Sequence, residues 1–306
     1  MAPPNLTREQ ARQRAALLSV EEYSIELDLT DGGGKPGEGT FSATTAVRFG
    51  CARPGEGSWI DLVAADVQSA TLNGTPLDVS GYREEDGIAL PDLTERNELM
   101  VAANCRYMNT GEGLHRFVDP LDGGVYLYSQ FETADAKRMF ACFDQPDLKA
   151  RYRLTVIAPR DWKVISNAPV VDTEDASGGA LRHTFARTEV LSTYLVALVA
   201  GPYAEWRDVH DGIPLGLYCR GSLAQHMDAE RLFTETKQGF DFFHDAFGVR
   251  YPFGKYDQCF VPEFNFGAME NAGCVTFSER HIFRSKVTEA EREGRADTIL
   301  HEMAHM

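Results

Sequence analysis

Ile299-Leu300-His301-Glu302-Met303-Ala304-His305 stands at the end of a chain of 306 residues and contains an H-E-x-x-H motif. Two histidines four residues apart on an α-helix project from one face, about a turn apart, so both rings can reach one small cation. This spacing is typical of zinc ligands, and bound zinc lowers the pKa of a coordinated water to about 7. Glu302 lies between the histidines and is the candidate general base that takes a proton from such a water.

A helix through this motif has two faces of different polarity. At about 100° per residue, the apolar side chains at 299, 300, 303 and 304 fall on one arc, opposite His301 and His305. We therefore expect the apolar arc to pack in a core and the histidines to face a cleft. The alternative is an ordinary helix with two surface histidines.

A second motif, Phe266-Gly267-Ala268-Met269-Glu270-Asn271, precedes the first by some thirty residues. Gly267 and Ala268 are small enough for a peptide to approach as an added strand. A peptide's free amine has a pKa near 8 and is largely protonated, so the Glu270 carboxylate could bind it. Asn271 either pins this turn or touches the substrate backbone. The alternative for Glu270 is an ordinary turn acid.

Together these motifs resemble the M1 family of zinc aminopeptidases, the gluzincins of the aminopeptidase N type, and actinobacterial members most closely. Gln130-Phe131-Glu132 and Cys142-Phe143-Asp144-Gln145-Pro146 are similar to signatures of that family's N-terminal domain. The resemblance implies one zinc ion held by His301 and His305, with Glu132 as a second carboxylate for the amine. It also implies that Gln130 and Phe266 line the pocket for the first side chain, and that Met269 belongs to the substrate-binding turn.

The resemblance also implies that two site residues of the family lie beyond the last residue of this sequence. The family's third zinc ligand, a glutamate, and a tyrosine that steadies the oxyanion both follow the second histidine beyond the position of Met306. The metal helix also has no glycine or asparagine to close it. We expect a fragment cut inside its catalytic domain, lacking both residues and nearly inactive by itself, since catalytic zinc sites use three protein ligands.

The composition of the chain limits the classes of binding partner that it favours. The net charge is −16 and the sequence pI about 4.9, which excludes nucleic acid and anionic membranes as favoured partners. Six scattered cysteines suggest reduced thiols. No signal peptide is evident, and the longest apolar run, 194–200, is too short to span a bilayer. We expect a cytoplasmic monomer acting on peptides with a free N-terminus.

The first two thirds of the chain alternate in polarity with a period of two. Such runs predict strands at 23–29, 41–49, 59–63 and 152–156, and the apolar run 194–200 predicts another. Leu72-Asn73-Gly74-Thr75 predicts a tight hairpin. A surface helix capped by Thr7 is expected over 6–18. We predict a multidomain chain whose first domain, 1–202, is an antiparallel all-β saddle or sandwich.

The pattern then changes to strands followed by helices. Strands are expected at 215–219, 256–260 and 274–277, and an amphipathic helix over 224–247 that stops at Gly248. A helical stretch from Glu289 to Glu293 is expected to be interrupted by Gly294 before the metal helix. Residues 203–306 thus predict the first part of an α+β domain, and the resemblance implies a thermolysin-like peptidase domain.

Three functions are compared. The leading hypothesis is a zinc aminopeptidase that hydrolyses the N-terminal residue from peptides. A leukotriene A4 hydrolase-like epoxide hydrolase and aminopeptidase shares both motifs, but typically has glutamine where Glu132 stands here. A non-catalytic peptide-binding module is expected to have lost Glu302 or a histidine, and this chain retains all three residues. The other six histidines have no partner at ligand spacing and are expected to be structural or exposed.

Overall fold

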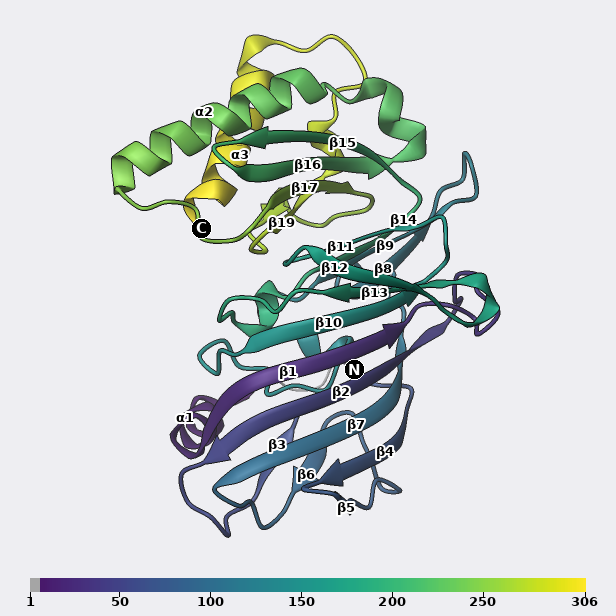
Figure 1. Cartoon of the computed structure of the whole chain (residues 1–306), viewed down its shortest axis with the longest axis vertical. Helices are drawn as coiled ribbons and strands as arrows, with labels where there is room; N and C mark the ends of the chain where they lie inside the picture. The colour runs from purple at the N-terminus through teal and green to yellow at the C-terminus, as the bar shows by residue number, and fades with distance from the viewer. Residues whose placement is uncertain (1–5) are drawn as a thin grey trace. The chain divides into compact units, whose positions relative to one another are not determined.

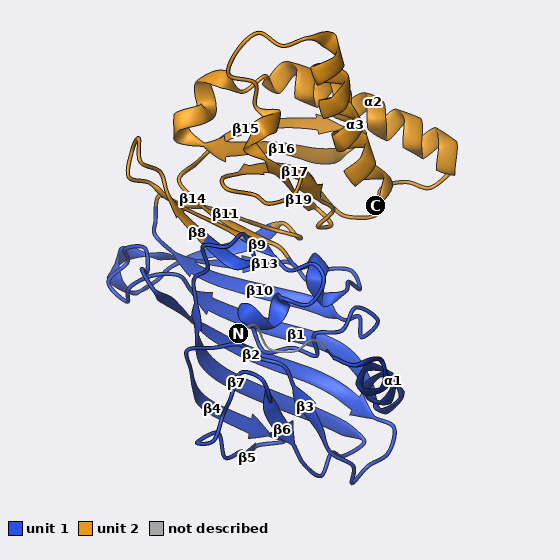
Figure 2. Cartoon of the chain, turned by 180° about the vertical axis from the view of Figure 1, so that it is seen from behind, with its two compact units in different colours: residues 1–115, 129–160, 170–196 blue, residues 116–128, 161–169, 197–306 orange. Residues whose placement is uncertain are grey.

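The computed structural model describes residues 6–306 (Figure 1). The chain forms two compact units that interleave along the sequence (Figure 2). The first unit contains residues up to 115, 129–160 and 170–196, and the second contains 116–128, 161–169 and 197–306. The domain boundary predicted between 202 and 203 stays a prediction, because two short segments before that point, 116–128 and 161–169, belong to the second unit.

The first unit is built on an eight-stranded sheet. Its strand order is β12-β13-β10-β1-β2-β7-β4-β5. The bounds are β1 Leu18–Asp28, β2 Thr40–Cys51, β4 Asp66–Leu72, β5 Thr75–Pro76, β7 Arg96–Arg106, β10 Arg151–Ala158, β12 Val170–Asp175 and β13 Leu181–Phe185. Burial alternates along β2, as its period of two predicts. The predicted hairpin joins β4 to β5, with Asn73 and Gly74 both at positive φ.

One pair in this sheet departs from the antiparallel prediction. β1 and β10 run parallel, with Tyr23 opposite Tyr152 and their rings stacked 5.2 Å apart, whereas the other pairs of this sheet are antiparallel. Alternation of apolar residues fixes which face of a strand is buried but not the direction in which it runs. The pairing partner of β1 was therefore not readable from the sequence.

The helix α1, Arg8–Leu17, begins where Thr7 predicted it. Thr7 and Gln10 form a reciprocal capping box. The expectation of a purely surface helix was wrong for Arg14, which is buried and contacts Asp61 at 2.7 Å and Gln145 at 3.1 Å. A buried guanidinium requires such partners.

Smaller elements complete the chain. β3 Ser58–Ile60 pairs with β6 Ile88–Leu90, and a four-stranded sheet has the order β11-β14-β9-β8. The bounds are β8 Gly113–Val118, β9 Val125–Gln130, β11 Lys163–Ser166 and β14 Leu198–Gly201. Short 3-10 helices span Ala136–Arg138, Ser177–Gly179, Thr193–Leu195, Gly221–His226 and Glu279–His281. The strand predicted over 194–200 is thus correct only in its second half.

The second unit holds a five-stranded sheet of order β15-β16-β17-β19-β18. Its bounds are β15 Tyr203–His210, β16 Ile213–Arg220, β17 Tyr256–Val261, β18 Ala268–Met269 and β19 Cys274–Ser278. The central strands β16, β17 and β19 are parallel, and the short β18 is an antiparallel edge strand. Two helices, α2 Ala229–Phe247 and α3 Glu289–Ala304, share one apolar core with this sheet (Figure 1). A mainly β part followed by an α+β part confirms the predicted fold class.

The two helix predictions in this unit need correction. α2 starts at Ala229, later than predicted, because a 3-10 helix occupies 221–226, and it ends before Gly248 at φ 65°. The predicted break at Gly294 is wrong, since α3 is continuous. A capping box between Thr288 and Glu291 starts the helix, and one interior glycine costs only about 1 kcal/mol.

The buried face of α3 also differs from the predicted arc. Ile299 and Met303 are buried as expected, but Leu300 is half-buried and Ala304 is exposed. Glu302, with 5% of its surface exposed, lies inside instead. The buried positions 295, 299, 302 and 303 follow one helical stripe, rotated from the predicted one because the sheet and α2 cover that side.

The cysteine prediction is confirmed, since all six thiols are free and buried. Within residues 6–306, no helix combines the length and the apolar character needed to cross a membrane.

Candidate metal centre

The last turn of α3 brings the two histidines of the H-E-x-x-H motif together. The Nε2 atoms of His301 and His305 are 3.3 Å apart, with ring centroids 4.9 Å apart. Two nitrogen ligands at about 2.0–2.1 Å from a tetrahedral zinc ion would be separated by about 3.3 Å. Both side chains are exposed, and His305 forms the helix cap. The pair therefore has the separation that a shared cation requires.

Two carboxylates lie beside this pair. Ligand atoms of Glu270, Glu302 and His305 all lie within 4.8 Å of one another. Glu270 is half-buried and Glu302 buried. Two imidazoles with carboxylate oxygens form a nitrogen and oxygen donor set that suits zinc. The residues present thus fit the metal that the motif predicts, and the structure brings Glu270 and Glu302 to His305, which in turn lies beside His301.

Glu302 has a tyrosine for a neighbour. Burial raises the pKa of Tyr256, and the negative charge of Glu302 raises it further. The Tyr256 hydroxyl is buried without a hydrogen-bond partner among the described residues. Nothing in the sequence distinguishes this tyrosine, which precedes the motif by more than forty residues and has no characteristic spacing to it.

The turn that carries Glu270 is held firmly to its own sheet. The Gly267 carbonyl accepts a hydrogen bond of 3.0 Å from Ser278 N–H. Asn271 Nδ2 donates to Thr276 Oγ1 at 3.3 Å, so Asn271 pins the turn. Met269 is buried and offers only its backbone to a ligand. The half-buried Ala268 lies with Met269 on the edge strand β18.

His281 lies in the 3-10 helix that follows β19. It is only 8% exposed, and burial lowers its pKa to about 4. The prediction that this histidine is structural or exposed is therefore confirmed in its structural form.

Phe266 is the exposed member of this segment. It is 46% exposed, and its ring lies 6.0 Å from that of Phe264. An exposed aromatic ring next to the edge strand is suited to contact an apolar side chain.

Gln130 and Glu132 belong to the first unit. Gln130 is 2% exposed, and neither of its amide atoms has a hydrogen-bond partner among the described residues. Glu132 is exposed. A buried amide without partners is costly unless a ligand satisfies it. The substrate roles of both residues stay predictions.

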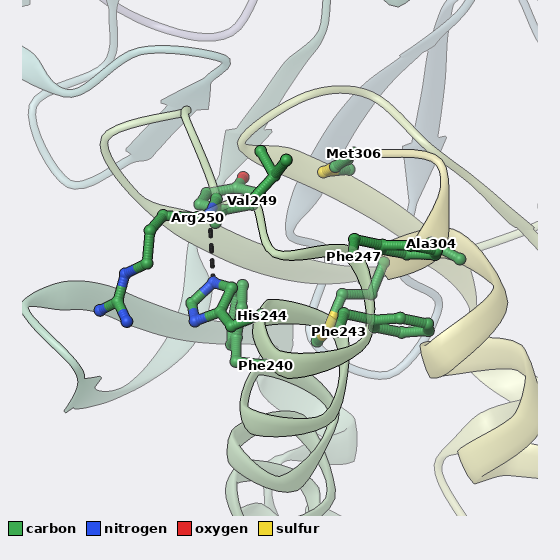
Figure 3. Close-up of a pocket in the computed structure, with 10 residues that line it drawn as sticks. Phe240, Phe243, His244, Phe247, Val249, Arg250, Ala304 and Met306 are labelled. Atoms are coloured by element: carbon green, nitrogen blue, oxygen red, sulfur yellow. Dashed lines mark hydrogen bonds between the residues drawn. The ribbon is translucent and has the colours of Figure 1, made fainter.

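A small apolar cavity lies beside the end of α3 (Figure 3). It measures about 60 Å³ and is lined chiefly by Phe240, Phe243 and Phe247 from α2 and by Met303 from α3. On its rim, His244 Nε2 accepts a hydrogen bond of 3.1 Å from Tyr251 N–H. The buried side of the turn that carries the histidines thus rests on aromatic side chains.

Comparison with known families assigns most of the chain. Residues 20–195 match the Peptidase M1 N-terminal domain, and residues 232–306 match the Peptidase family M1 domain. The second match includes the turn at Gly267 and both histidines.

The relatives are aminopeptidases. The chain is 54% identical to aminopeptidase N of Streptomyces lividans over 311 residues, which covers 100% of this chain and 35% of that protein. It is 29% identical to aminopeptidase N of Acetobacter pasteurianus over 79% of this chain and 74% of that protein. It is 34% identical to glutamyl aminopeptidase of Rattus norvegicus over 57% of this chain and 18% of that protein. The chain therefore spans about a third of the length of the Streptomyces relative.

Proposed function

The chain belongs to the M1 family of peptidases, and from this membership we propose that the protein is a zinc-dependent aminopeptidase that removes the N-terminal residue of peptides. The observation that carries the proposal is the 3.3 Å separation of the His301 and His305 Nε2 atoms beside two carboxylates. The names of the aminopeptidase relatives support it.

His301 and His305 would hold the metal through their Nε2 atoms. Zinc bound there would supply a water of lowered pKa and would polarise the carbonyl of the bond to be cleaved. A carboxylate oxygen of Glu302 would accept a proton from the attacking water, since Glu302 is the buried acid within 4.8 Å of His305. Burial of Glu302 among packed residues limits the orientations its carboxylate can adopt, which favours proton transfer in one geometry.

The edge strand β18 supports peptide binding without regard to sequence. Its outer edge can pair with the main chain of a peptide, as strands added to sheet edges do. Glu270 directly follows β18, so its carboxylate would bind the ammonium group at the start of that peptide. An internal peptide bond offers no such cation, and the enzyme would therefore cleave from the N-terminal end.

The remaining roles concern specificity. Glu132 would supply a second carboxylate for the amine, and the partnerless amide of Gln130 would contact the first residue of the substrate. Phe266 would favour neutral or apolar first side chains, because its exposed ring gains from contact with them. The presence of Glu132 rather than glutamine favours a plain peptidase over the epoxide hydrolase alternative.

Metal binding is testable on the 306-residue chain itself. Equilibrium dialysis against Zn²⁺ should show saturable binding that His301→Ala and His305→Ala each weaken by at least about tenfold. His226→Ala, at a half-buried position away from the motif, is the matched control and should bind as the unaltered chain does. Equal zinc affinity in all four proteins would contradict the proposed ligand pair.

Catalysis is testable in a chimaera in which residues 1–306 are followed by the remaining sequence of the Streptomyces relative. It should hydrolyse alanine anilide and reject N-acetylalanine anilide, whereas the 306-residue chain should be nearly inactive because catalytic zinc sites use three protein ligands. Glu302→Gln should lower kcat by about a hundredfold or more at unchanged zinc content. Glu270→Gln should raise KM. Full activity of Glu302→Gln would rule out the proposed base.

A further inference from the structure

A basic segment, residues 280–286, is separated from the end of β19 by one residue, Glu279. It contains Arg280, Arg284 and Lys286 and no acidic residue, although the whole chain carries a net charge of −16. All three cationic side chains are exposed. Ser278, two residues before this segment, donates its backbone N–H to the Gly267 carbonyl at 3.0 Å, so the segment starts close to the edge strand to which the substrate is proposed to bind.

Arg280 is the member of this segment that reaches the turn. Its Nη2 lies 2.9 Å from the position that a Cβ on Gly267 would occupy, so the guanidinium lies against the glycine itself. Any larger residue at 267 would displace it. Gly267 immediately precedes β18, and Arg280 thus stands at one end of the edge strand while Glu270 stands at the other.

The Arg280 guanidinium is not neutralised by the protein. None of the ion pairs formed within residues 6–306 includes it, and the adjacent acid Glu279 is bound instead by Arg220 Nε at 2.6 Å. The Arg280 guanidinium is exposed, lies against the Gly267 backbone and has no carboxylate partner in the described part of the chain. Such a group is suited to bind the carboxylate of a ligand through two parallel hydrogen bonds.

The separation of the two charges sets the position on the peptide that Arg280 would contact. Gly267 and Glu270 are three residues apart, about 10 Å along a strand. A peptide whose ammonium group is held by Glu270 and whose backbone follows β18 would place its second or third residue beside Gly267. That is the part of the substrate just beyond the bond to be cleaved.

We propose that Arg280 is a specificity-determining residue that binds a carboxylate at the second or third residue of the peptide. The carboxylate is either an acidic side chain or the C-terminus of a dipeptide or tripeptide. This inference rests on the proposed function, because it uses the same strand and the same amine anchor. It adds a selectivity that the metal-binding motif does not provide.

The first test measures binding without turnover. Saturation-transfer difference NMR on the metal-free 306-residue chain compares Ala-Glu-Ala-amide with Ala-Gln-Ala-amide, and Ala-Ala-Ala with its C-terminal amide. We expect the carboxylate member of at least one pair to bind about fivefold more tightly, as suits an exposed charged hydrogen bond. The first pair reports a side-chain carboxylate and the second a C-terminal one.

Variants assign that preference to one residue. Arg280→Gln should abolish it while the amide peptides bind as before, and Arg280→Lys should keep part of it. Arg284→Gln removes the same charge from the same segment and should keep the full preference. An absent preference in the unaltered chain, an Arg280→Gln variant that retains it, or an equal loss in Arg284→Gln would overturn the proposal.

The second test separates this inference from the proposed function. In the chimaera, Arg280→Gln should leave kcat/KM for the amide peptides and the zinc content unchanged and should lower kcat/KM for the preferred carboxylate peptides about fivefold. If all peptides are hydrolysed equally by both proteins, the role of Arg280 is refuted and the aminopeptidase assignment stands. If the unaltered chimaera hydrolyses no peptide at all, the aminopeptidase assignment fails as well.

Discussion

Two glycines in the helices of the second unit should respond in opposite ways to the same substitution. Gly239 lies in α2 where the helix packs against α3, and a Cβ there would be 2.5 Å from Leu300 Cδ2 and 3.0 Å from Met303 Sδ. Gly294 lies in α3 and is exposed, with no atom within 4 Å of an added Cβ. We expect Gly239→Ala to destabilise the protein and Gly294→Ala to stabilise it.

The magnitudes follow from two effects. Alanine in place of glycine in a helix interior gains about 0.8–1.0 kcal/mol, and Gly294→Ala should show this gain in full. Gly239→Ala has the same gain, but an extra methyl in a packed interface costs about 1–3 kcal/mol. Gly239→Ala should therefore lower the free energy of unfolding by up to about 2 kcal/mol, and the two variants should differ by about 1–3 kcal/mol.

Urea unfolding followed by circular dichroism measures both variants under one condition, and zinc dialysis adds a second observable. Leu300 and Met303 flank His301 and Glu302, so a shift of α3 in Gly239→Ala should also weaken zinc binding, whereas Gly294→Ala should leave it unchanged. If Gly239→Ala stabilises the protein as much as Gly294→Ala, the close approach of the two helices is not what requires glycine, and the packing argument is refuted.

Two further changes test the burial of His281 and the start of the metal helix. His281 has a folded-state pKa of about 4 against an ordinary 6.5, so the unfolded chain binds its proton first and stability should fall as pH drops from about 6.5 to 4. The difference in unfolding free energy between pH 7 and pH 4.5, measured with urea, should be smaller in His281→Gln by at most about 3 kcal/mol. The same difference in both proteins would contradict the assignment of this pH dependence to His281. Thr288→Ala removes the capping box of α3 and should cost about 1 kcal/mol in the same assay, whereas no loss would show that the cap is dispensable.

The sequence alone was sufficient wherever the relevant geometry lies within one element. The histidines at 301 and 305 had to share a face because helical periodicity is local. Likewise, Thr7 with Gln10 identified the start of α1, and Asn73-Gly74 identified a hairpin, because capping and turn formation depend on neighbours along the chain.

Only the tertiary structure decided relations between elements. It made β1 and β10 parallel and buried Glu302 in place of Ala304. It also placed Glu270 beside His305 and laid Arg280 against Gly267. The physical reason is that burial depends on which surfaces meet when sheet and helices pack, and residues distant in the sequence set those contacts without leaving a periodic pattern in the chain.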